Sequence, residues 1–94
     1  MDRLTFFNLI TGIRYPEMLI EYYDQFLALK QLVNGYPCAI DVSGSTDRSI
    51  SFNIDCDKNT MNLISMNKVM VIYGRSISIY TEPVSDKQIK VTLQ

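Results

Sequence analysis

The fold of this chain is decided by residues 15–35, YPEMLIEYYDQFLALKQLVNG, which have the pattern of one long amphipathic helix. Proline is tolerated in a first helical turn because its missing N–H would have no partner there, and an acidic residue after it complements the helix dipole. Gly35 suits the other end, because glycine enters the left-handed conformation of a helix C-terminus at little cost. Polar residues recur at spacings of three and four: Glu17, Glu21, Asp24, Gln25 and Gln31. We therefore predict a long helix over residues 16–34.

The apolar face of this helix is wider than contact with a sheet requires. Ten large apolar residues lie between positions 18 and 33, whereas a sheet covers a helical stripe about 100° wide. We expect some of these apolar residues to lie outside the contact with the sheet and to form a protein interface. The predicted interface residues are Ile20, Tyr23, Leu27 and Leu29.

The segment before the helix, residues 3–11, is rich in apolar residues and could cover part of that surface. Asp2 can cap a short helix that ends at Gly12, because an aspartate side chain accepts hydrogen bonds from the free N–H groups of a first turn. The alternative is an edge strand added to the sheet. We predict the short helix.

After Gly35 the period of the apolar residues changes from about 3.6 to 2, which is typical of half-buried strands. The alternation is clear in residues 38–42, 49–57 and 89–93. The residues expected to face one another in the core are Ile50, Phe52 and Ile54 from the strands and Leu19, Phe26 and Val33 from the helix.

Residues 69–73, VMVIY, are apolar on both faces, so we predict a strand that lies centrally in the sheet or under a helix. Gly74 and Arg75 follow and suit the two-residue loop of a type II′ hairpin. Residues 76–80 alternate again, residues 82–86 are expected to form a loop, and residues 61–65 could add a short strand.

Together these elements predict the α+β class. We expect one compact domain over residues 1–94, with the N-terminal helical segment packed on an antiparallel β-meander of four to five strands. The order of elements is similar to that of cystatin-like and Sm-like folds, a likeness of topology that implies no activity.

The composition argues against several classes of function. The chain has no histidine, so Ser-His-Asp and Cys-His catalytic arrangements cannot form within it, and we expect neither enzymatic activity nor a cofactor. The net charge is −1 and the basic residues are dispersed among acidic ones, so we do not expect nucleic acid as the main partner. No stretch approaches the ~20 apolar residues of a membrane span, and the N-terminus lacks the pattern of a signal peptide, which together indicate the cytoplasm.

Residues 41–45, DVSGS, resemble the metal-ion-dependent adhesion motif, Asp-x-Ser-x-Ser, of von Willebrand factor A domains. The resemblance implies that Asp41, Ser43 and Ser45 would hold Mg²⁺, which prefers hard oxygen ligands. The family has a helix after the motif, whereas an alternating strand follows it here. We therefore interpret the segment as a polar hairpin loop and predict no metal site.

Residues 55–60 imitate the start of a calcium-binding loop, with oxygen side chains at the first, third and fifth positions. The glycine required at the sixth position is missing. We interpret this segment as a solvated turn without flanking helices.

The two cysteines invite a disulfide, which the expected strand register opposes. If strands 37–43 and 48–56 pair around a short loop, Cys38 faces Asn53, and Cys56 lies three residues further along. That offset is roughly 10 Å at the rise of a strand, beyond the reach of an S–S bond. We predict two free thiols that act as small hydrophobic residues on the inner face.

These observations favour a small non-enzymatic protein-interaction module, either an adaptor, an inhibitor or an oligomerising subunit, that binds another protein, itself or both. Six tyrosines support this expectation, because tyrosine is enriched where one end of the side chain stays in water. An origin in a virus or mobile element fits a chain of this size. The alternatives are a small-ligand or divalent-metal binding module that uses the Asp41 loop, and an Sm-like nucleic-acid-associated module.

Overall fold

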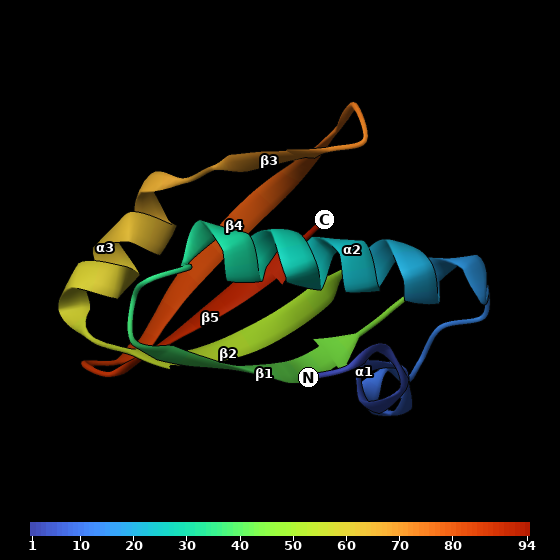
Figure 1. Ribbon diagram of the computed structural model, residues 1–94, viewed down its shortest axis with the longest axis horizontal. Coiled ribbons are helices and arrows are strands. Elements are labelled where there is room, and N and C mark those ends of the chain that lie inside the picture. Colours follow the sequence, from blue (N-terminus) through green and yellow to red (C-terminus); the bar gives the residue numbers. More distant parts are fainter.

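The computed structural model describes residues 1–94 and contains three helices and a five-stranded antiparallel sheet (Figure 1). The helices are α1 (Arg3–Leu9), α2 (Glu17–Leu32) and α3 (Lys58–Met66). The strands are β1 (Cys38–Ser45), β2 (Ile50–Cys56), β3 (Val69–Ile72), β4 (Arg75–Ser85) and β5 (Gln88–Leu93). The α+β class is thereby confirmed, as is the order of a short helix followed by a long one. None of the helices has the length and apolar character needed to cross a lipid bilayer.

The strand order in the sheet is β1-β2-β5-β4-β3. β3, β4 and β5 form the expected meander, and β5 also pairs with β2, so that the β1–β2 hairpin extends the sheet beyond β5. α2 runs along one face of the sheet (Figure 1). The opposite face carries polar residues such as Asn53 and Lys90. Because β1 and β3 stand at the two ends of the strand order, they are the edge strands.

The hydrophobic core lies between α2 and the inner face of the sheet. Ile50, Phe52 and Ile54 are fully buried, as predicted. Phe26 of α2 stacks on Phe52 with ring centroids 5.8 Å apart, while Leu19 packs at the margin of the core and is only half buried. The two apolar periods in the sequence thus predicted the surfaces that meet.

The short helix α1 begins at Asp2, as predicted. The Asp2 carboxylate accepts a hydrogen bond of 2.7 Å from the backbone N–H of Thr5, and this bond lowers the pKa of Asp2 below its usual 3.8. The helix ends before Ile10 rather than at Gly12.

Helix α3 was not predicted, and it begins with the same aspartate–threonine arrangement. Asp57 accepts hydrogen bonds of 2.8 Å from both the backbone N–H and the hydroxyl of Thr60. The expectations of a solvated turn over residues 55–60 and a strand over residues 61–65 are wrong, because Asp57 caps a helix that continues to Met66.

The β1–β2 turn lies further along the chain than predicted. β1 extends to Ser45, so residues 41–45 are strand and not a hairpin loop. The turn is formed by residues 46–49, where the Thr46 hydroxyl accepts hydrogen bonds from the backbone N–H groups of Arg48 and Ser49. The later position of the turn shifts the register of the two strands from the expected one.

Of residues 82–86, only Asp86 lies in a turn, so the predicted loop is wrong for residues 82–85. β4 continues to Ser85 and pairs with β5 along this length, with a β-bulge between Pro83 and Ser85. A proline is compatible with pairing at a bulge because the ladder hydrogen bonds are already interrupted there.

Candidate interaction surfaces

The four residues predicted to form an interface on α2 do not share one surface. Ile20 and Leu27 are 60% and 42% exposed, whereas Leu29 is fully buried and Tyr23 is half buried. The assignment of Leu29 to an interface is therefore wrong. Leu29 lies three residues after Phe26 on the same helical face, and both point into the core.

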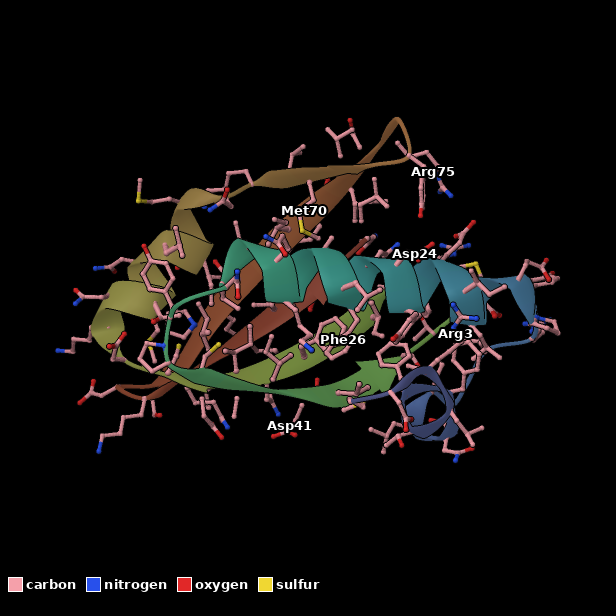
Figure 2. The ribbon with its side chains drawn as sticks, viewed as in Figure 1. Arg3, Asp24, Phe26, Asp41, Met70 and Arg75 are labelled. Carbon is pink, nitrogen blue, oxygen red and sulfur yellow. The ribbon has the colours of Figure 1, made fainter.

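Helix α1 covers the apolar surface around Tyr23. The rings of Phe6 and Phe7 lie edge-to-face against Tyr23, with centroid distances of 5.4 and 6.2 Å. The guanidinium of Arg3, which lies between α1 and α2 (Figure 2), is 5.5 Å from the centre of the same ring. The exposed apolar surface on α2 is thereby reduced to Ile20 and Leu27.

The most apolar strand of the sheet, β3, lies at an edge, so the central position, one of the two that were predicted, is wrong. The other predicted position, under a helix, holds only for the face of β3 that packs against the core. Met70 points from β3 toward α2 (Figure 2), and it packs against the core together with Ile72. Val69 and Val71 alternate with these residues and are 51% and 68% exposed on the opposite face. The central position was predicted because a strand that is apolar on both faces is normally covered on both.

The backbone of β3 is open along this edge. The carbonyl of Lys68 accepts a hydrogen bond of 2.9 Å from the N–H of Ile79 in β4. Because backbone groups alternate in direction along a strand, the N–H and C=O groups of Lys68, Met70 and Ile72 face β4. The N–H and C=O groups of Val69 and Val71 therefore point to the free side, where no strand lies. Such a row of unpaired groups is a template for pairing with another strand.

The other edge strand, β1, has features that oppose such pairing. Pro37 precedes it, and a β-bulge between Val42 and Gly44 distorts it. The hydroxyl of its last residue, Ser45, exchanges hydrogen bonds with the backbone N–H and C=O of Thr11 in the α1–α2 connection. β3, with the sequence VMVI, contains no proline, bulge or charge. Only β3 therefore presents an unprotected edge.

The β3–β4 hairpin turns at Tyr73 and Gly74, one residue earlier than predicted. Both residues have positive φ, 50° and 77°, as in a type I′ turn and unlike the predicted type II′ turn. Tyr73 is the only non-glycine residue with positive φ, and it is 87% exposed. Asparagine or glycine is usual here, because the left-handed conformation costs other residues about 1–2 kcal/mol. Tyr73 thus neither favours the turn nor packs into the core.

A small pocket of about 200 Å³ lies between α2 and this hairpin. Glu21 and Arg75, which both line it, form an ion pair at 3.0 Å, and Asp24 lies on the same side of α2 (Figure 2). The side chain of Gln25 is buried beside the pocket, and its Oε1 atom has no hydrogen-bond partner. A buried polar group without a partner costs about 1–3 kcal/mol, so this amide weakens the packing of α2 against the tip end of the hairpin.

Tyr22 has a structural role that differs from those of Tyr23 and Tyr73. Tyr22 belongs to α2, and its ring is buried in the core. Its hydroxyl donates a hydrogen bond to the carbonyl of Thr46 in the β1–β2 turn. Burial raises the pKa of Tyr22, and the negative charges of Asp47 and Glu21 raise it further. The hydroxyl therefore remains a donor at neutral pH.

The side chains of Asp41, Ser43 and Ser45 do not converge on one point. Asp41 and Ser43 are exposed on β1 (Figure 2 shows Asp41 pointing away from α2), whereas the Ser45 hydroxyl is bonded to Thr11. Between Asp41 and Ser45, the bulge after Val42 shifts the pairing of β1 with β2. The structure contains no group of three or more histidine, cysteine, aspartate and glutamate side chains that could hold a metal ion.

The sequence pattern did not identify Val69, Val71 and Tyr73 as surface residues. The available signal was the pair Tyr73-Gly74 after an apolar run, which also fits a two-residue hairpin loop. Comparisons of the chain with protein-family models, with curated proteins and with solved structures found no match. The functional interpretation therefore rests on the geometry of this chain.

Proposed function

We propose that this chain is a non-enzymatic protein-interaction module that binds its partner at the β3 edge and the adjoining hairpin tip. The proposal rests on Tyr73, an exposed aromatic residue in a disfavoured backbone conformation, at the end of an unprotected apolar strand. Residues in such conformations cluster at functional sites, and tyrosine is enriched in binding surfaces.

A strand added to β3 would satisfy two kinds of free group at once. Its backbone would pair with the open N–H and C=O groups of Val69 and Val71. Its outward side chains would remove the two valine side chains from water. This mode of binding uses main-chain hydrogen bonds for affinity and alternate side chains for specificity.

We infer that the partner is a second copy of the chain, because β3 is complementary to itself. In an antiparallel pairing about a two-fold axis at Met70, Val69 of one copy lies opposite Val71 of the other. Each of the two Val69–Val71 pairs exchanges two N–H···O=C bonds, since these residues carry the open backbone groups. The four valines then form one apolar cluster on the outer face. No charges are brought together, because β3 itself is uncharged.

Sedimentation velocity of the full chain, from about 10 μM to 1 mM, tests this proposal. We expect a weak, reversible monomer–dimer equilibrium, because contact between two short strands buries less than the ~1,000 Å² of a stable interface. Val71→Lys is expected to abolish the dimer, since a lysine on an edge strand opposes pairing. The matched control is Val84→Lys, at an exposed valine of β4 away from this edge. A wild-type monomer at every concentration, or equal loss in both variants, would contradict the proposal.

A mixed sample of isotope-labelled and unlabelled chains tests the register. Met70 lies on the two-fold axis in a non-hydrogen-bonded pair, where facing Cα atoms are about 4.5 Å apart. We therefore expect an intermolecular nuclear Overhauser effect between the Met70 Hα protons of the two copies. Intermolecular contacts at Ile20 and Leu27 would instead assign the interface to α2.

We also propose a cytoplasmic location, a reducing compartment in which the thiols of Cys38 and Cys56 would stay free. No observation favours the nucleic-acid alternative. Lys90 is the one basic residue among the strand residues of the open face, and Glu82 is its register partner on β4. That face therefore lacks the basic footprint of nucleic-acid-binding surfaces.

A further inference from the structure

The two cysteines lie directly opposite each other at one end of the β1–β2 hairpin. Cys38 and Cys56 are register partners, and both are free thiols. The predicted offset of three residues, with Cys38 facing Asn53, is therefore wrong. It placed the turn near residues 45–46, whereas the turn lies at residues 46–49, and it did not include the bulge after Val42.

The hydrogen bonding of Cys56 shows which kind of pair this is. Its backbone N–H donates to the carbonyl of Lys87 at 2.9 Å, on the side of β2 that faces β5. The N–H and C=O of one strand residue point to the same side, so neither group of Cys56 faces β1. Cys38 and Cys56 thus form a non-hydrogen-bonded pair. In such pairs the Cα atoms are about 4.5 Å apart and the side chains are close, within the range that a disulfide spans.

Cys38 can be reached from solvent. It is half buried, and it lines an open pocket of about 330 Å³ between the C-terminal half of α2 and β1, which Lys30 and Tyr36 also line. Cys56, beside it on β2, is buried. Burial raises the pKa of both thiols, and the charges of neighbouring groups raise that of Cys56 further. The pair therefore reacts slowly at neutral pH and stays reduced in a reducing compartment.

We propose that Cys38 and Cys56 are an oxidisable dithiol that closes into a cross-strand disulfide and locks the start of β1 to β2. The oxidant is a low-molecular-weight disulfide such as oxidised glutathione. The Cys38 thiolate attacks one sulfur of the oxidant, forms a mixed disulfide and releases one glutathione thiolate, which takes up the proton lost by Cys38. The Cys56 thiolate then attacks the Cys38 sulfur and releases the second glutathione, which takes up the other proton. The protein loses two hydrogens, and the oxidant becomes two thiols.

The disulfide would act on a part of the sheet that the β3 edge does not include. β1 and β3 are the opposite edges of the sheet, so this proposal stands independently of dimer formation. The lock would hold the β1 wall of the pocket beside Cys38 in place. The disulfide would also stabilise the fold, because a bond between residues 38 and 56 restricts the conformations of the unfolded chain.

Intact-mass analysis of the folded full chain with oxidised glutathione tests this inference. After an alkylation quench, we expect a product that has lost two hydrogens and takes up no alkylating agent, whereas the reduced chain takes up two equivalents. Cys56→Ser is expected to stop at a glutathione adduct on Cys38, and Cys38→Ser to react far more slowly because Cys56 is buried. The oxidised wild type should melt higher by on the order of 10 °C.

Three results would overturn the proposal. The first is a stable glutathione adduct on the wild type in place of the closed product. The second is a disulfide-linked dimer on a non-reducing gel. The third is closure only when urea unfolds the chain, since the native register would then not bring the thiols together.

Discussion

Replacement of Tyr73 by asparagine is expected to stabilise the fold while it removes the proposed binding residue. Tyr73 has φ of 50° and is 87% exposed, so its side chain contributes few contacts that the substitution would lose. The left-handed conformation costs an ordinary residue about 1–2 kcal/mol, and asparagine adopts it more readily. We expect a gain of about 0.5–1 kcal/mol in the free energy of unfolding, against a total of about 5–14 kcal/mol for a chain of this length. The melting temperature should rise by about 2–8 °C.

Urea unfolding followed by circular dichroism measures this change. The chain is kept at a few micromolar, because dimer formation would add apparent stability at higher concentrations. Tyr73→Ala is the matched control: it removes the ring but keeps the disfavoured conformation, so its midpoint should stay close to that of the wild type. Both variants should self-associate more weakly than the wild type but retain the Val69–Val71 pairing. If Tyr73→Asn unfolds at a lower urea concentration than the wild type, the tyrosine ring stabilises the fold and the reasoning is wrong.

Three further predictions concern stability. Phe52→Ala should lower the free energy of unfolding by about 3–5 kcal/mol, because Phe52 is fully buried and stacks on Phe26; an unchanged melting temperature would show that Phe52 does not lie in the core. Gln25→Leu should be neutral or stabilise by up to ~1 kcal/mol in urea unfolding, because the Oε1 atom has no partner to lose; a clear loss would mean that the amide is satisfied. Asp57→Asn should flatten the decline of melting temperature with acid. The lowered pKa of Asp57 means that the stability from its ionised cap is present above the unfolded-state value of 3.8 and is lost as pH falls through the folded-state value. If the melting temperature falls equally with pH in the wild type and in Asp57→Asn, other carboxylates cause the decline.

The local elements with a strong period were predictable from residues alone. The 3.6-residue period and its end signals predicted α2 to within two residues at each end, and alternation predicted the inner faces of β2 and β5. α3 was missed although Asp57 and Thr60 repeat the capping arrangement of Asp2 and Thr5. The segment had been interpreted by its oxygen side chains as a turn, and a short helix has few apolar residues with which to show a period.

Periodicity reports which side chains share a face, because that depends only on the local backbone geometry of a helix or strand. It carries no information on which strand neighbours which. The edge position of β3 follows from the return of β5 to pair with β2, a contact between segments more than thirty residues apart. The pairing of Cys38 with Cys56 depends on one turn and one bulge, since a shift of a single residue in register changes every cross-strand partner. Local patterns of residues were therefore enough to predict the helices with clear end signals and the core-facing residues, and the composition alone excludes histidine chemistry. Which apolar residues remain in water and which thiols meet depends on the order and register of the strands, so these features became visible only in the folded structure.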